Sequence, residues 1–188
     1  SAKNKKKAFL SPLNELEITF SNHRGNLPTI KKVELSEKLP DEVNVHQNAV
    51  IFFLSDFLNQ ILKNESQQVA LYQEIKFFKQ KILDKKMHAH YFFLIRMLQF
   101  FGISPLVSEE KFLNIEKGIF QEEIAQKEVD EELSFLWKKI LDKEIEEDFI
   151  IEKKSRKPLL DSILQYYKTH FPEFYAPKSL PVILEVFE

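Results

Sequence analysis

Residues 91–105 read YFFLIRMLQFFGISP, and this stretch decides the fold. Most positions before the proline carry large apolar side chains, too many for one exposed helix face, so the stretch predicts a helix buried on most sides within a helical core. Gly102 follows the last apolar turn, where a left-handed residue ends a helix, and Pro105 prevents its resumption. Arg96 is the charge inside this run, and it must reach the surface or hold an acidic group.

The composition agrees with a packed helical protein. There are 188 residues with 18 Phe, 44% hydrophobic residues and only 3 Gly, whereas a sandwich or barrel needs more turn glycines. Without cysteine the chain has no disulfide and no cysteine-ligated zinc, which fits a reducing cytosol. Neither a signal peptide nor an apolar segment of membrane-spanning length is recognisable. We therefore expect a soluble intracellular protein.

The first 35 residues have the period of β-strands. Residues 8–20 predict two short strands broken at Ser11-Pro12, residues 23–26 (HRGN) predict a turn, and residues 29–35 predict one more strand. A polar linker follows. We therefore expect a small β domain with its linker at residues 1–40 and a helical domain at residues 41–188, which makes the chain predominantly α-helical and α+β overall.

Beyond residue 45 the apolar period becomes helical. The first predicted helix runs to about residue 63, and the second, with Asn64 and Gln67 as a capping pair, ends near residue 84. Residues 111–120, with a central glycine, predict a structured loop or short hairpin. The later apolar stripes predict three more helices, the second of them starting near Pro158 with Ser155 as its N-cap. These stripes are Leu133, Leu136, Trp137, Ile140 and Leu141; Leu159, Leu160, Ile163, Leu164 and Tyr167; and Leu180, Ile183, Leu184 and Phe187.

Charge is segregated along the chain. Residues 1–32 hold seven basic and two acidic side chains, a net of +5, so the whole-chain charge of −2 leaves −7 for the remainder. A basic end on an acidic body predicts a local anion-binding surface, although a solubilising loop is the simpler alternative. A second basic run precedes the fifth helix and is either part of a DNA path or ordinary linker chemistry. The candidate DNA-binding residues are Lys3, Lys5, Lys6, Lys7 and Arg24 in the first cluster, and Lys153, Lys154 and Arg156 in the second.

No catalytic or metal motif stands out. His88 and His90 are two positions apart, which does not place them on one helix face, so we interpret them as surface residues and expect no metal. The acidic residues between 109 and 152 lack an accompanying nucleophile or glycine-rich loop and predict a solvated face. Tyr166 and Tyr167 are candidates for stacking on bases, but Tyr167 lies on an apolar stripe and is better interpreted as core. No cofactor and no enzymatic activity are expected.

An ordered set of segments resembles the RecO family of recombination mediators. The set comprises SAKNKKKAFLSPLNELEI, YFFLIRMLQFFGISP, FLNIEKGIF, RKPLLDSILQYYKTHFPEF and SLPVILEVF. The resemblance implies an N-terminal OB-fold, here lacking its early strands, followed by a helical domain of the zinc-free type. It also implies binding to single- and double-stranded DNA, annealing of complementary strands, and loading of RecA with RecR on DNA coated by the single-strand-binding protein SSB, in the RecF pathway. The alternative is a helical protein-protein adaptor without a DNA role.

The resemblance further implies a receptor for the SSB C-terminal tail in the helical domain. That tail ends in an apolar residue with a free carboxylate behind a run of acids, so its receptor needs an apolar pocket beside a fixed cation. The candidates are Arg96 for the carboxylate and Phe92, Phe93 and Phe100 for the apolar residue. The alternative for Arg96 is that it reaches solvent or pairs with a nearby acid. The expected location is the cytoplasm, in association with the nucleoid.

Overall fold

The computed structural model describes residues 9, 11–21, 27–37, 43–63, 65, 67–86, 88–142 and 150–187. The chain divides into two compact units, residues 1–44 and residues 45–188. The larger unit is helical and the smaller one holds an antiparallel pair of strands, so the protein is mostly α-helical and α+β overall, as predicted. The elements are β1 (Glu15–Ser21), β2 (Thr29–Glu37), α2 (Val45–Ile61), α3 (Val69–Leu83), α4 (Ala89–Phe100), β3 (Phe112–Asn114), β4 (Ile119–Gln121), α5 (Glu131–Asp142), α6 (Lys153–His170) and α7 (Leu180–Phe187).

The smaller unit is organised around the β1–β2 hairpin. Apolar residues pair across it, with Ile18 opposite Val33 and Phe20 opposite Ile30, because alternate residues of each strand share a face. The second of the two strands predicted within residues 8–20 is confirmed as β1, and the strand predicted at residues 29–35 is confirmed as β2. The strand expected just before Ser11 is wrong at Phe9, which is helical. The turn predicted at residues 23–26 lies outside the described residues.

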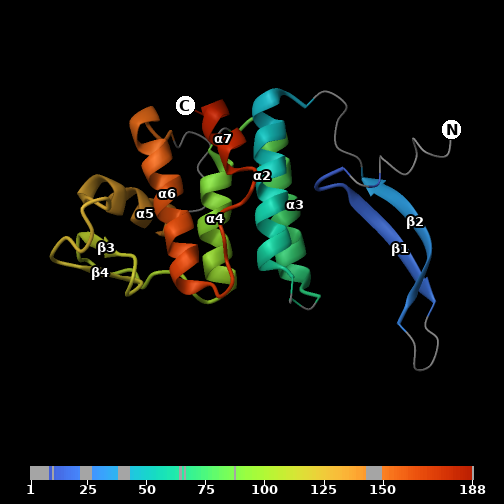
Figure 1. The fold of residues 1–188 in the computed structure, drawn as a ribbon, viewed down its shortest axis with the longest axis horizontal. Coiled ribbons are helices and arrows are strands. Elements are labelled where there is room, and N and C mark those ends of the chain that lie inside the picture. The colour runs from blue at the N-terminus through green and yellow to red at the C-terminus, as the bar shows by residue number, and fades with distance from the viewer. Residues whose placement is uncertain are drawn as a thin grey trace. The chain divides into compact units, whose positions relative to one another are not determined.

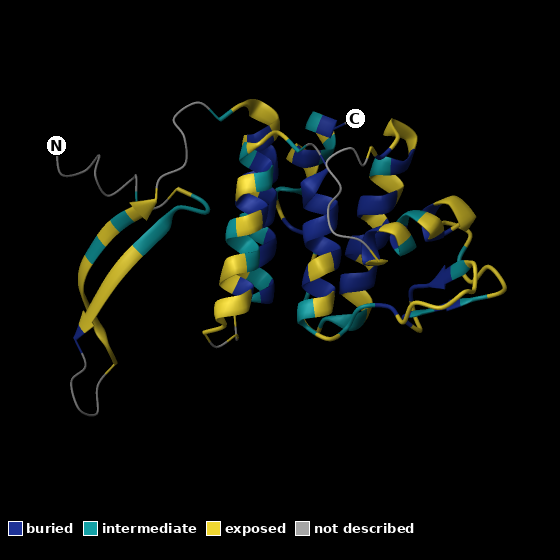
Figure 2. Cartoon of the chain, turned by 180° about the vertical axis from the view of Figure 1, so that it is seen from behind, coloured by how far each residue is buried: buried dark blue, intermediate teal, exposed yellow. Residues whose placement is uncertain are grey.

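Helix α4 lies in the middle of the helical unit, with α2 and α3 on one side and α5 and α6 on the other (Figure 1). Nine of its twelve residues are buried, and Figure 2 shows it as one of the most buried elements. The helix ends in a Schellman motif: the Ile103 amide donates to the Leu98 carbonyl and the Gly102 amide to the Gln99 carbonyl, both at 3.0 Å. Gly102 has φ +67°, the left-handed conformation predicted for it.

The phenylalanine-rich composition reflects an aromatic core that joins distant helices. Phe57 of α2 contacts Tyr167 of α6 edge-on, with ring centroids 4.9 Å apart. Phe93 of α4 meets Phe78 of α3 at 5.0 Å. The Tyr167 hydroxyl donates to the Leu94 carbonyl at 2.7 Å, which satisfies a polar group that is fully buried. Tyr166 is 1% exposed and Tyr167 is fully buried, so neither presents a ring to a nucleic acid base.

Two further sequence interpretations of the helical unit need correction. Helix α3 begins at Val69 behind Gln68, so Gln67 does not cap it, and Asn64 lies outside the described residues. His88 and His90 are not surface residues: they are 7% and 1% exposed. The His88 Nδ1 accepts the Ile151 amide at 3.1 Å, which ties the start of α4 to the segment before α6.

Candidate functional site

The second basic cluster forms the first turns of α6, five residues earlier than the predicted start near Pro158. Ser155 is therefore inside the helix and Glu152 occupies the N-cap position. The Ser155 hydroxyl donates to Glu132 of α5 at 2.8 Å, and this contact between distant segments holds the early turn. The interpretation of these cations as a linker is wrong, because helical spacing places them on defined faces.

Lys154 is directed toward α5. Its Nζ lies 3.1 Å from a Glu132 carboxylate oxygen and 3.5 Å from one of Glu152. The hydrogen bond from Lys154 to Glu132 raises the pKa of that lysine, and the pKa of Glu132 is lowered by hydrogen bonds, first from Ser155 and then from Lys154. These side chains are more than half exposed, so the pair contributes little to stability.

Arg156 is held in place differently. Its Nε–H donates to the Ile151 carbonyl oxygen at 3.1 Å, and Ile151 is fully buried. The same Ile151 is bonded through its amide to His88. The guanidinium is thereby fixed at the start of α6 with further N–H donors left on its outer nitrogens, because one Nε contact uses only one of five donors.

A small hollow of roughly 100 Å³ opens beside these cations, between α4, α6 and α7. We call it the basic hollow, and its lining is Tyr91, Lys153, Arg156, Lys157, Leu160, Ile183, Leu184 and Phe187. Its floor is apolar or aromatic and its rim carries three cations. Burial raises the pKa of the Tyr91 phenol far above its ordinary value, so that group stays neutral. The arrangement suits an apolar side chain that carries a neighbouring carboxylate.

The residues predicted for such a ligand on the central helix do not form an open pocket. Phe92 and Phe93 are 4% and 1% exposed and belong to the core. Arg96 is on the surface and its Nε lies 2.6 Å from the Glu74 carboxylate of α3, which is the pairing with a nearby acid given as the alternative. Phe100 is half-buried at the end of α4. Lys3, Lys5, Lys6, Lys7 and Arg24 lie outside the described residues.

The basic hollow was not predicted from the sequence, although the spacing of its residues on α6 could have indicated part of it. Lys153, Arg156 and Lys157 lie seven, four and three residues before Leu160, which is the spacing of one helix face. That face therefore combines three cations with an apolar residue. The contribution of Tyr91 and α7 could not be found this way, because no periodic pattern links segments so distant in sequence.

The described part of the chain contains neither a metal-type cluster nor a membrane-spanning helix. No group of three or more histidine, aspartate or glutamate side chains gathers there as a metal site. Among the helices of the same residues, none is long and apolar enough to cross a bilayer.

Comparison with known proteins identifies several similar chains. DNA repair protein RecO of Flavobacterium psychrophilum is 26% identical over 196 aligned positions, which cover 98% of this chain and 81% of the relative. The RecO proteins of Christiangramia forsetii and Azobacteroides pseudotrichonymphae are each 28% identical, over 97% of this chain and 80% of their own lengths. No protein-family model matches the chain, and no solved structure matches it significantly.

Proposed function

This chain belongs to the RecO family of DNA repair proteins, and from that premise we propose that it acts in DNA repair and homologous recombination as a mediator. In this proposal it binds and anneals single-stranded DNA, also binds duplex DNA, and works with RecR in the RecF pathway to load RecA on SSB-coated DNA. It acts by binding rather than by catalysis, needs no cofactor, and works in the cytoplasm at the nucleoid. The similarity to RecO proteins supports the DNA role. The basic hollow supports the proposed contact with SSB.

The basic hollow has the chemistry that the SSB tail requires. An apolar terminal side chain would enter against Leu160, Ile183 and Phe187, while its carboxylate meets the fixed guanidinium of Arg156. Lys153 and Lys157 on the rim would face the acidic residues that precede the terminus. Arg96 is a weaker candidate than Arg156, because its charge is already paired with the Glu74 carboxylate, whereas the hydrogen bond described for Arg156 is to a neutral carbonyl, and because the neighbouring rings of Phe92 and Phe93 are buried.

Arg156→Ala is expected to weaken binding of an SSB tail peptide by about tenfold or more, since a hydrogen bond to a charged group typically contributes roughly 1.5–3 kcal/mol. Calorimetric titration of the peptide into each purified variant measures this. Lys154→Ala is the matched control: it removes an exposed cation from the same turn, but one that does not line the hollow. Arg96→Ala is expected to retain wild-type affinity.

The variants separate the two candidate receptors. Weakening by Arg96→Ala with unchanged binding by Arg156→Ala would return the site to the central helix. Equal weakening by Arg156→Ala and Lys154→Ala would indicate general electrostatic attraction rather than a pocket. Absence of peptide binding to the wild-type protein would reject the SSB contact itself.

DNA binding is expected to depend on the two basic clusters through phosphate contacts. Each true contact releases condensed counterions, so single Ala variants of Lys5 or Lys153 should lower the slope of log affinity against log salt for single strands by roughly 0.7. Fluorescence anisotropy with an oligothymidylate over a salt series measures the slope. Lys127→Ala, within the acidic stretch, should leave it unchanged. If reversal of Lys3, Lys5, Lys6 and Lys7 to Glu leaves the affinity for DNA at low salt unaltered, the first cluster is not a DNA site. If the wild-type protein shows no salt-dependent DNA binding at all, it is better described as a protein-protein adaptor.

A further inference from the structure

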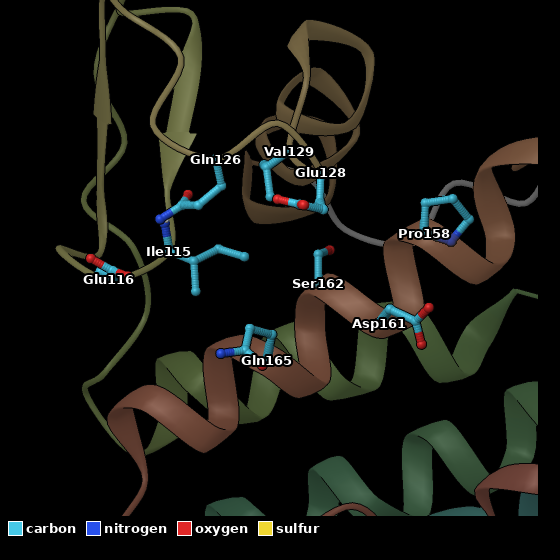
Figure 3. Close-up of a pocket in the computed structure, with 9 residues that line it drawn as sticks. All are labelled: Ile115, Glu116, Gln126, Glu128, Val129, Pro158, Asp161, Ser162 and Gln165. Atoms are coloured by element: carbon cyan, nitrogen blue, oxygen red, sulfur yellow. The ribbon is translucent and has the colours of Figure 1, made fainter.

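A second and larger hollow, of roughly 640 Å³, lies along another face of α6 (Figure 3). Its walls come from α6, from the loop that joins β3 to β4, and from the segment just before α5. Ile115, Val129 and Pro158 supply its apolar surface. It shares no residue with the basic hollow.

Hydrogen bonds hold the walls of this hollow in place. The Ile115 amide donates to the Gln126 side-chain oxygen at 3.3 Å, which joins the loop to the segment before α5. The Ile115 carbonyl oxygen lies 2.6 Å from Nε2 of His170 on α6. Ser162 at the base accepts the Trp137 indole N–H at 2.8 Å and donates to the Leu159 carbonyl. The hollow is therefore formed before any ligand arrives.

Its charge is opposite to that of the basic hollow. Glu116, Glu128 and Asp161 are exposed at its edge, and no cation belongs to its described lining. Residues 109–132, which include two of these acids, contain nine acidic residues and three lysines, a net charge of −6. A phosphate backbone would be repelled here. The negative electrostatic potential around this hollow favours a cationic ligand instead.

The positions of the acids restrict the shape of that ligand. Figure 3 shows Glu116 at one end of the hollow and Asp161 toward the other, with the Ile115 side chain between them and Glu128 on the opposite wall. A ligand that uses all three carboxylates must carry positive charges on both sides of an apolar group. A short extended peptide with basic residues flanking an apolar residue meets this requirement, because the long, flexible Lys and Arg side chains on either side of the apolar group can turn toward the carboxylates.

We propose that this acidic hollow binds a short, extended, basic segment of a partner protein, with an apolar side chain against Ile115 and Val129 and flanking Lys or Arg side chains paired with Glu116, Glu128 and Asp161. On this assignment α6 serves two ligands of opposite charge. Residues 153, 156, 157 and 160 face the acidic peptide, and residues 158, 161, 162 and 165 face the basic one.

The test uses a fluorescein-labelled peptide with the core Lys-Leu-Arg-Leu-Lys, followed by anisotropy against the full chain at low salt. We expect it to bind, and a Lys-Ser-Arg-Ser-Lys peptide to bind about tenfold or more weakly because it lacks the apolar contact. A Glu-Leu-Glu-Leu-Glu peptide should not bind. No binding of the first peptide, or equal binding of the first two, would overturn the proposal.

Two kinds of variant localise the binding. Replacing Glu116, Glu128 and Asp161 together by Gln, Gln and Asn should lower the affinity for the first peptide by about tenfold, since each exposed ion pair contributes modestly to binding. Gln165→Trp should weaken it comparably by filling the hollow without a change of charge. The matched control neutralises Glu109, Glu122 and Glu123 as Gln, which alters net charge equally outside the hollow. Equal loss in this control, wild-type binding in both hollow variants, or displacement of the peptide by a single-stranded oligonucleotide would contradict the assignment.

Discussion

Trp137→Ala is expected to lower the free energy of unfolding by about 4 kcal/mol, within the range for removal of a large core aromatic. Trp137 is fully buried in α5, and its indole N–H donates to Ser162 of α6 at 2.8 Å. Its ring also packs on Tyr166, with centroids 5.5 Å apart. One side chain therefore fixes α5 against the helix that lines both hollows. Urea unfolding monitored by circular dichroism measures the change.

Two milder variants divide this effect into packing and hydrogen bonding. Trp137→Phe keeps most of the apolar contact, and the Ser162 hydroxyl keeps the Leu159 carbonyl as its acceptor, so the loss should be only about 1–2 kcal/mol. Ser162→Ala strands the buried indole N–H and should cost about 1–3 kcal/mol. A loss of less than about 1 kcal/mol for Trp137→Ala would show that α5 is not part of the cooperative core.

Gly118→Ala is expected to destabilise the protein by about 3 kcal/mol, through left-handed strain and the displacement of a buried tyrosine. Gly118 has φ +63°, and a Cβ there would lie 2.7 Å from the Tyr166 hydroxyl oxygen. That hydroxyl donates to the Ile103 carbonyl at 2.8 Å, and burial raises the pKa of Tyr166 to about 12, so the phenol remains a neutral donor. Tyr166 is 1% exposed and has little room to move.

Gly102→Ala is the matched control for Gly118→Ala. Gly102 has a similar φ of +67°, but nothing lies within 4 Å of a Cβ built on it. Its substitution should therefore cost only the backbone strain, about 1–2 kcal/mol. Thermal unfolding should separate the two variants by several degrees, since about 2–4 °C corresponds to each kcal/mol in a protein of this size. Equal losses would mean that Tyr166 adjusts without penalty.

The helices that sequence predicted well are those with a complete local signal. The stripe of Val50, Phe53, Phe57 and Ile61 is buried throughout α2, because the 3.6-residue period depends on the segment alone. The Gly102 stop on α4 is similarly local. The early start of α6 was missed because it depends on Ser155 meeting Glu132, 23 residues away. A run of lysines has no apolar period to reveal such a contact.

The same distinction between local signals and long-range contacts explains why the burial of the histidines and the position of the candidate site were not predicted. Whether His88 and His90 are buried is decided by Ile151, 63 residues beyond His88, and by Phe187, whose ring lies 5.0 Å from that of His90. Spacing along the helix could exclude a shared metal but not place the rings. Likewise, the cations of the basic hollow were identifiable from sequence, whereas its position required α4, α6 and α7 to be brought together.

The start of α6 has an electrical consequence for the free protein. The amino end of a helix carries a partial positive charge that favours acids, yet the first turn here contains no acid and begins Lys153-Lys154. Cations so placed oppose the helix dipole, and among the described residues the carboxylates of Glu132 and Glu152 offset this only at Lys154. An anion bound at this end, as proposed for the SSB tail, would relieve both the unfavourable interaction with the dipole and the repulsion among the cations. On that proposal, ligand binding and the stability of the folded protein are thermodynamically linked, so the ligand should raise the melting temperature.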